Sequence, residues 1–280
     1  MIEGTARKQP DPAPARRACA RLVPVGAALV AAHYVPSAVV LGQWGPFCTL
    51  FGELCRWQGP RASTRVALTF DDGPDPEGTP RVLDALDELG LRATFFVLGE
   101  RVRAHPDLVD EIARRGHQLA THGDEHARHL ARSPLWVRRD LERARDAMAV
   151  LGHAPRWYRP AFGQPSGSTL AVARAMGLRT VLWSAWGREW VAPGPGEVAA
   201  RVTRRLRPGA IVLLHDTTAS ALGACGATRS GPFPWWQRSC AAAALRRRRW
   251  MSWSPEVACP GAERTFVRPG RTCCKATKIG

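Results

Sequence analysis

The sequence predicts an α/β domain with a parallel sheet over residues 65–218. Short apolar runs of strand length alternate there with segments of helical periodicity, and several of the helical segments end at a glycine. Acidic residues or histidines follow several of the apolar runs. About six βα units in a row indicate a parallel sheet, either an open doubly wound sheet or a barrel. Both arrangements bring the carboxyl ends of the strands to one edge, where such folds carry their chemistry.

Each element of the domain has its own signal. The helices carry apolar residues three and four positions apart, and glycines such as Gly90 and Gly152 stand where C-caps are expected. The predicted strands are Val66–Phe70, Ala93–Leu98, His117–Thr121, Arg156–Arg159, Arg179–Trp183 and Ala210–Leu214. The predicted helices are Glu77–Leu89, His105–Arg115, Leu135–Leu151, Ser168–Met176 and Glu197–Leu206.

The chain before this domain divides into three segments. Residues 1–21 are rich in Pro, Ala and Arg and are predicted to be disordered. Residues 22–41 form an apolar stretch after three arginines, which suits a membrane anchor or an uncleaved signal and favours the cell envelope over the cytoplasm. The prolines and the histidine within it leave open an Ala-rich helix that packs on the domain or stays loosely ordered. Residues 42–64, with several Gly and Pro, are predicted to be a linker.

Two adjacent carboxylates follow the first strand, in Val66-Ala-Leu-Thr-Phe-Asp-Asp-Gly-Pro74. Successive residues at a strand end diverge, so that Asp71 and Asp72 can serve two purposes, one as a metal ligand and one in proton transfer. The alternative is a simple turn, because Asp, Gly and Pro are common turn residues.

Two histidines follow the third strand, in Thr121-His-Gly-Asp-Glu-His126. One helical turn would bring the imidazoles of His122 and His126 to one face. With Asp72 they would form a site of two histidines and one carboxylate, which leaves positions open for water and substrate. A lone histidine is usually a surface or core residue, but a pair at this spacing favours metal ligation. His129, one turn further on, is interpreted as a helix surface residue or a contact behind the ligands.

Three further stretches lie at strand ends. Arg159, in Trp157-Tyr-Arg-Pro-Ala-Phe-Gly163, is held extended by the following proline and could pair with Asp71 in a bidentate manner, or lie on the surface of a turn. Ile211-Val-Leu-Leu-His-Asp216 delivers His215 to the same edge. Between them, the tryptophans of Leu182–Trp190 either form a sugar-binding wall or belong to the core. These tryptophans are Trp183, Trp186 and Trp190.

Taken in order, these five stretches resemble the five motifs of the NodB-type polysaccharide deacetylases, carbohydrate esterase family 4. The resemblance covers Arg65 to Thr217, a little over half of the chain. It implies a distorted (β/α) barrel with fewer than eight strands. It also implies metal-dependent removal of N-acetyl, sometimes O-acetyl, groups from an amino-sugar polymer such as peptidoglycan or a chitin-like glycan, with release of acetate.

The resemblance also implies a role for each matching residue. One divalent ion, usually zinc, is expected on three ligands: Asp72, His122 and His126. The expected proton-transfer residues are Asp71 as the base, Arg159 as its tether and His215 as the general acid. The expected substrate contacts are the backbone N–H of Phe162 at the oxyanion and Leu213 or Leu214 as the apolar wall of an acetyl pocket.

Two motifs depart from the family pattern. The third usually reads Arg-Pro-Pro-Tyr and here reads Arg159-Pro-Ala-Phe162, so that a tyrosine hydroxyl is missing. The fourth usually carries two carboxylates, Asp-x-x-Asp-Trp, and here has Trp186 and Glu189 in their places. The first of those carboxylates normally orients the acid histidine. Either Glu189 substitutes for it, or His215 is poorly tuned.

The segment 219–280 lacks helical or strand periodicity and is strongly basic. It holds eleven Lys or Arg residues against two Glu, so that most of the formal net charge of +16 lies outside the domain. The domain therefore gives no argument for nucleic-acid binding. Two interpretations of the segment remain: an extension that binds an anionic wall polymer or membrane surface, or translation in a shifted reading frame, which its composition favours.

Other functions remain open at this level. The eight cysteines lie outside the alternating βα region and lack a Cys-x-x-Cys spacing, so they are interpreted as non-catalytic. The main alternative activity is hydrolysis of another non-peptide C–N bond by the same barrel. A catalytically weak carbohydrate-binding protein is the alternative from another class, and it is suggested by the altered fourth motif.

Overall fold

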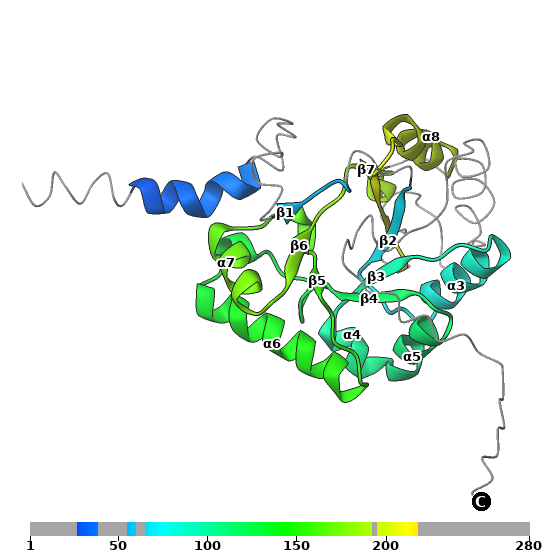
Figure 1. The fold of residues 1–280 in the computed structure, drawn as a ribbon, viewed down its shortest axis with the longest axis horizontal. Helices are drawn as coiled ribbons and strands as arrows, with labels where there is room; N and C mark the ends of the chain where they lie inside the picture. The colour runs from blue at the N-terminus through cyan, green and yellow to red at the C-terminus, as the bar shows by residue number, and fades with distance from the viewer. Residues whose placement is uncertain (1–26, 39–54, 60–64, 192–194, 218–280) are drawn as a thin grey trace, which may run out of the picture.

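The computed structural model describes residues 27–38, 55–59, 65–191 and 195–217. The predicted disordered N-terminus and the basic segment 219–280 lie outside the described residues. The described strands form one eight-stranded sheet in the order β1-β6-β5-β4-β3-β2-β8-β7, with every neighbouring pair parallel (Figure 1).

The elements follow the predicted alternation closely. The strands are β1 (Cys55–Arg56), β2 (Ala67–Asp71), β3 (Thr94–Val97), β4 (Gln118–Thr121), β5 (Trp157–Tyr158), β6 (Arg179–Val181), β7 (Ala185–Trp186) and β8 (Ile211–His215). The α-helices are α3 (Gly78–Glu88), α4 (Gly99–Ala104), α5 (Pro106–Arg114), α6 (Pro134–Val150), α7 (Gly167–Ala175) and α8 (Pro195–Arg205). Short 3-10 turns occupy His129–Ala131, Ala161–Gly163 and Glu189–Val191.

The sheet curls until its two ends approach each other. Just after β1, Gln58 forms an antiparallel bridge with Ala210, which precedes β8. The N–H of Gly59 donates to the carbonyl of Gly209 at 2.8 Å. Helices such as α3, α5 and α6 lie outside the curl (Figure 1). Of the two arrangements that the sequence allows, the chain adopts the barrel, and the predicted distorted (β/α) barrel is confirmed.

The two faces of the curled sheet carry different side chains. Phe70 of β2 stacks on Phe95 of β3, with ring centroids 5.2 Å apart, in the core cluster beneath α3 and α5. Ala67 faces the opposite way and packs with Ile211 in a second cluster inside the curl. Burial of each large apolar side chain contributes about 1.5–3 kcal/mol. Because side chains alternate along a strand, Asp71 at the end of β2 shares the inner face.

The sequence missed three short elements. The helix predicted over His105–Arg115 is α5, but α4 precedes it, a six-residue charged segment in which Val102 is the buried large apolar side chain. β1 and β7 contain two residues each, too few for an alternating pattern. β1 lies within the predicted linker 42–64, so that part of this segment belongs to the sheet.

A helix over residues 27–38 lies within the predicted apolar segment 22–41. The side chain of His33 donates through Nε2 to the carbonyl of Leu130 at 2.9 Å, and the hydroxyl of Ser37 donates to the carbonyl of Pro165 at 2.8 Å. These contacts hold the described part of the segment on the domain. Among the described helices, none combines the length and the apolar character needed to cross a bilayer.

Candidate active site

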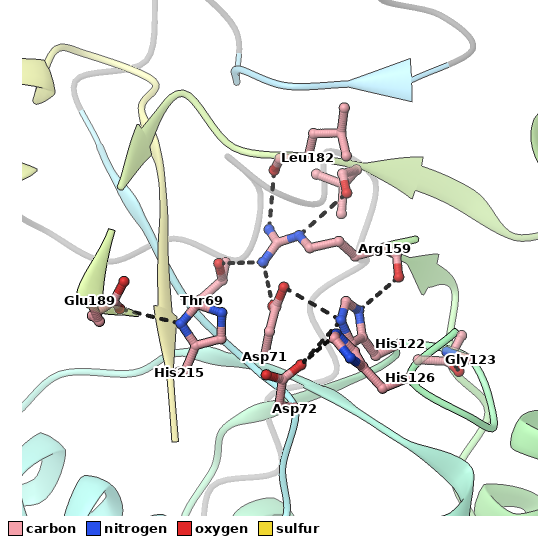
Figure 2. Close-up of polar contacts among 12 residues, drawn as sticks. Thr69, Asp71, Asp72, His122, Gly123, His126, Arg159, Leu182, Glu189 and His215 are labelled. Atoms are coloured by element: carbon pink, nitrogen blue, oxygen red, sulfur yellow. Dashed lines mark hydrogen bonds and ion pairs between the residues drawn. The ribbon is translucent and has the colours of Figure 1, made fainter. Parts of the chain in front are cut away.

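The two adjacent carboxylates diverge at the end of β2. Asp71 is the last residue of the strand, and Asp72 adopts a positive φ of 75° that turns the chain away from the strand direction. Asp71 therefore points toward Arg159, whereas Asp72 points toward His122 and His126 (Figure 2). The two carboxylates therefore face different partners, as expected for successive residues at a strand end.

The three predicted metal ligands lie together. Oδ1 of Asp72 lies 3.4 Å from Nε2 of His122 and 3.4 Å from Nε2 of His126. One ligand atom from each of the three residues falls within 4.8 Å of the others. Nδ1–H of His122 donates to the carbonyl of Arg159 at 2.8 Å, which fixes the tautomer and leaves the Nε2 lone pair toward Asp72. Two imidazoles and one carboxylate make a donor set that fits a divalent cation such as zinc.

The charges of the cluster also suit a cation. Burial would raise the pKa of Asp72, but the imidazoles of His122, His215 and His126 outweigh it and hold that pKa well below its usual range. Burial lowers the pKa of His126. Burial also opposes a charge on His122, but Asp71 and Asp72 raise its pKa overall. A proton on His122 therefore competes with a cation for this position.

The backbone conformation between His122 and His126 differs from the prediction. We expected one helical turn over residues 122–126, but these residues form a bent loop without helical hydrogen bonding. The imidazoles of His122 and His126 still approach to 5.5 Å between ring centroids. The prediction of a helix was wrong because Gly123, with a φ of 95°, and contacts from α6 give this loop its own conformation.

Arg159 is fully buried and pairs with Asp71. Its NH1 donates to Oδ1 of Asp71 at 2.6 Å and to the hydroxyl of Thr69 at 2.8 Å. Its NH2 donates to the carbonyl of Leu182 at 3.1 Å, and the guanidinium stacks 4.0 Å from the ring centroid of Phe96. The surface alternative is wrong, and the contact with Asp71 uses one nitrogen in place of the expected bidentate pair. Nε of Arg159 donates to the carbonyl of Val181 at 3.4 Å, so each nitrogen of this buried guanidinium has an acceptor.

His215 stands beside Asp71 and carries its own carboxylate partner. The register of β8 on β2 aligns His215 with Asp71. Nδ1 of His215 lies 3.4 Å from Oε1 of Glu189, which is buried in the 3-10 turn after β7 (Figure 2). Burial would lower the pKa of His215, but Glu189, Asp72 and Asp71 together raise it to about 9. The neighbouring carboxylates therefore favour the protonated imidazole.

Phe162 lies next to His126, one of the predicted metal ligands. It adopts a φ of 58°, a left-handed conformation that costs a non-glycine residue about 1–2 kcal/mol. Its ring lies 4.4 Å from that of His126, and the residue is 42% exposed. The guanidinium of Arg128 lies 4.5 Å from the same ring. Strained residues of this kind cluster at functional sites.

The predicted tryptophans and leucines divide between core and site. Trp183 packs against the core clusters, and its ring lies 5.8 Å from that of Trp186. The side chain of Trp190 lies outside the described part of the structure. Leu214 belongs to the outer core cluster with Phe70. Alternation along β8 then leaves Leu213 on the face of His215, as the better candidate for an apolar wall.

A family model described as "Polysaccharide deacetylase" matches residues 58–181. A peptidoglycan-N-acetylglucosamine deacetylase of Bacillus cereus is 35% identical to the chain over 163 residues, which are 57% of this chain and 76% of that protein. The chain belongs to the polysaccharide deacetylase family.

Two further comparisons agree with this assignment to the polysaccharide deacetylases. A chitooligosaccharide deacetylase of Rhizobium leguminosarum bv. trifolii is 38% identical over 157 residues, 54% of this chain and 71% of that protein. A crystal structure of a peptidoglycan N-acetylglucosamine deacetylase in complex with 4-naphthalen-1-yl-N-oxidanyl-benzamide has a TM-score of 0.66 and 26% identity. The match covers 76% of this chain and 97% of that one. The resemblance therefore extends from the five motifs to the curled barrel.

Several polar residues that support the site of this polysaccharide deacetylase were missed in the sequence. Thr69 donates its hydroxyl to the carbonyl of Val212 at 2.6 Å while accepting from Arg159. Asp216 accepts from the hydroxyl of Thr79 at 2.6 Å, and burial raises its pKa to about 7. Asp216 could have been suspected from its position after His215. Thr69 has the pattern of an ordinary strand residue, and no sequence signal identifies it.

Proposed function

We propose that the protein is a metal-dependent hydrolase that removes N-acetyl groups from an amino-sugar polymer, peptidoglycan or a chitin-like glycan, and releases acetate. The observation that carries this proposal is the convergence of Asp72, His122 and His126 beside the pair formed by Asp71 and Arg159. His215 completes the site on the neighbouring strand. Family membership supports the reaction class, and the names of the two relatives support an N-acetylglucosamine polymer or oligomer as the substrate.

The metal would be held by Asp72, His122 and His126, and zinc suits this donor set best. When bound, such an ion supplies a Lewis acid for the acetyl carbonyl and lowers the pKa of a coordinated water molecule. The protein fixes the ligands in advance: the Arg159 carbonyl orients His122, and the low pKa of Asp72 keeps it ionised.

Asp71 is the proposed general base. Its Oδ1 is held by Arg159 at 2.6 Å, while its Oδ2 lies 3.9 Å from Nε2 of His122, on the side of the metal ligands. Oδ2 is therefore the oxygen proposed to take a proton from an attacking water molecule. Arg159 keeps the carboxylate in one orientation and balances its charge.

His215 is the proposed general acid. Cleavage of the C–N bond requires a proton on the leaving nitrogen, because an amide anion is a poor leaving group. With a pKa of about 9, His215 holds that proton at neutral pH. Glu189 orients the imidazole through Nδ1, so that Nε2 is left to donate.

The remaining contacts would position the substrate. The backbone N–H of Phe162 is the proposed donor to the oxyanion, because its left-handed conformation sets the direction of this group at the rim. Leu213 is the proposed apolar wall for the acetyl methyl. Trp183 and Trp186 are proposed to contact the sugar rings with the parts of their side chains that the core leaves accessible.

Acetate release tests the proposal directly. The chain would be stripped of metal with a chelator and assayed on peptidoglycan and chitooligosaccharides, with and without added zinc. We expect zinc-dependent acetate release from at least one glycan and a loss of about 10²–10⁴-fold in Asp71→Asn, the usual contribution of a general base. Exposed Asp146 offers the matched control, Asp146→Asn. Zinc-independent release, or equal activity of Asp71→Asn, would contradict the assignment.

The altered fourth motif favours a second candidate, a carbohydrate-binding protein of weak activity. Binding of a chitooligosaccharide to the zinc-loaded chain without acetate release would support this candidate. A panel of small amides and imides in the same assay covers the other alternative, hydrolysis of a different non-peptide C–N bond.

A further inference from the structure

The loop between the two histidine ligands is anchored by residues outside the active site. Residues 122–126 lack helical hydrogen bonds, so their conformation depends on contacts from other elements. Such contacts come from two helices, α4 and α6, which pack against each other and both bind residues of the loop. The most direct one is made by Asp140, a fully buried carboxylate in the middle of α6.

Asp140 binds the main chain of the loop. Its Oδ2 accepts from the backbone N–H of Asp124 at 3.2 Å, and its Oδ1 accepts from that of Glu125 at 3.1 Å. Hydrogen bonds to an ionised acceptor are stronger than neutral ones. A side chain at Gly123 would place its Cβ 2.7 Å from Oδ2 of Asp140, so the close approach of loop and carboxylate requires glycine there.

The other side of the Asp140 carboxylate faces a buried histidine. Nε2 of His129 lies 3.4 Å from Oδ2 of Asp140, and Nδ1 of His129 lies 3.0 Å from the hydroxyl of Tyr158. If the hydroxyl donates to Nδ1, the proton of His129 is on Nε2 and faces Asp140. The burial of His129 excludes a position on the helix surface and leaves the other predicted position, a contact behind the ligands.

The side chain of Asp124 anchors the same loop through Arg103 of α4 and Arg143 of α6, and NH2 of Arg143 also lies 3.7 Å from Oδ1 of Asp140. The two oxygens of Asp124 accept from NH1 and NH2 of Arg103 at 2.7 and 3.1 Å, and Oδ2 also accepts from Nε of Arg143 at 2.8 Å. The carbonyls of Gly123 and Asp124 accept from the first two amides of α4, those of Gly99 and Glu100. Both the main chain and the side chain of Asp124, at the centre of the loop, are therefore held by hydrogen bonds.

We infer that Asp140 is a positioning residue for metal binding: it holds the loop in the conformation that brings His122 and His126 to one ion. The arginine pair on Asp124 assists it from the surface. This inference rests on the metal site of the proposed function. It goes beyond that function because the described contacts of Asp140 are with the main chain of the loop and with His129 and Arg143, none of which is a proposed ligand. A loop fixed in advance loses less conformational entropy when the ion binds, which raises affinity.

The test measures zinc affinity by competition with a chromophoric chelator, without any substrate. Asp140→Asn keeps the shape but replaces one acceptor oxygen with a donor, which leaves a loop amide unpaired. We expect its zinc affinity to fall by about 10-fold or more, as for partners outside the ligand set. At saturating zinc, the kcat of Asp140→Asn should differ from that of the wild type by a smaller factor than its zinc affinity does. Asp146→Asn, an exposed substitution on the same helix, should leave zinc affinity unchanged.

A second variant covers the case in which Asp140→Asn does not fold. Arg103→Gln combined with Arg143→Gln changes two half-exposed side chains and should lower zinc affinity by several-fold while circular dichroism stays as in the wild type. Wild-type affinity in a folded Asp140→Asn, or in this double variant if Asp140→Asn is unfolded, would overturn the inference. If the wild-type chain bound zinc but released no acetate, the proposed substrate and reaction would be wrong. The inference about Asp140 would still be decided by the zinc affinities of the variants.

Discussion

Oε1 of Glu189 lies 3.4 Å from Nδ1 of His215, across 26 positions of sequence. The family pattern would place a carboxylate at position 186, where this chain has a tryptophan. The 3-10 turn over Glu189–Val191 instead delivers a carboxylate from three residues further on. Of the two possibilities left open by the sequence, a substitute partner or a poorly tuned histidine, this geometry favours the substitute.

Glu189→Gln should therefore change the pH dependence of the reaction. The general acid must carry its proton, and it does so below its pKa, which Glu189 helps to raise to about 9. Loss of the negative charge lowers that pKa toward its ordinary value near 6.5, so the protonated fraction at pH 8 decreases. We expect the alkaline limb of kcat/KM to move to lower pH. Rate profiles between pH 6 and pH 10 would measure this shift.

The control for this variant is Glu88→Gln, an exposed change of the same chemistry at the end of α3. An alkaline limb at the same pH in Glu189→Gln and in the wild type would exclude Glu189 as the partner of His215. Loss of all activity at every pH, with a folded protein, would instead indicate that Glu189 contacts the substrate.

The buried pair of Arg159 and Asp71 gives a prediction about stability. In Arg159→Ala the Asp71 carboxylate would remain buried next to an empty space, and Thr69 and two carbonyls would lose their donor. Removal of one partner from a buried ion pair typically costs about 3–5 kcal/mol. We expect the free energy of unfolding in urea to fall by about this amount. Arg145→Ala, at an exposed position of α6, should change it by less than about 0.5 kcal/mol.

Asp71→Asn tests the catalytic role of the pair formed by Asp71 and Arg159 separately from its contribution to stability. Its amide oxygen can still accept from Arg159, so a folded protein is expected, but it can no longer take a proton. A stable but inactive Asp71→Asn together with an unstable Arg159→Ala would support the roles of base and tether. An Arg159→Ala as stable as the wild type would contradict the structural part of the argument.

The sequence predicted the strand ends better than the path between them. Asp71, Asp72, His122 and His215 could be placed because parallel strands bring their carboxyl ends to one edge, so that a correct strand assignment fixes the position of the next residue. The conformation of the loop after His122 could not be predicted, because it depends on contacts with residues of α4 and α6 that are distant in sequence.

The supporting residues could not be predicted for a related reason. Asp140 stands in a helix rich in Arg, where a carboxylate normally forms surface ion pairs. Its burial arises from packing of α6 behind the loop, which local sequence does not encode. Glu189 was considered because of its position in an altered motif. Its approach to His215 depends on the 3-10 turn, whose three residues carry no periodic signal.

Metal removal should abolish activity, and the two proposed histidine ligands should differ from the other histidines in their effect on zinc binding. His126→Ala removes one imidazole from the cluster at a partly exposed position, so the fold should survive. We expect its zinc affinity to fall by more than about 100-fold, beyond the effect of a partner outside the ligand set. His153→Ala, whose imidazole faces Asp110 on α5, should leave zinc affinity unchanged.

The same measurement has an expected pH dependence. Because Asp71 and Asp72 raise the pKa of His122, a proton competes with zinc as the pH falls through that raised range. Zinc affinity should therefore decrease from neutral to mildly acidic pH. Calorimetry in buffers of different ionisation enthalpy should detect proton release on zinc binding. Binding without proton release near the pKa of His122 would indicate that His122 is not a ligand.

Phe162 offers the sharpest test of the backbone oxyanion donor. If the family's tyrosine contributes mainly its N–H, Phe162→Tyr should change kcat/KM by less than about 10-fold, the value of one neutral hydrogen bond. Phe162→Gly keeps the N–H and adopts the φ of 58° without strain, but it loses the ring contact with His126 and Arg128. We therefore expect Phe162→Gly to raise KM and to leave kcat within a small factor of the wild type. Steady-state kinetics on one acetylated oligosaccharide would separate these effects, and a large fall in kcat for Phe162→Gly would show that the side chain, not the backbone, acts in the chemical step.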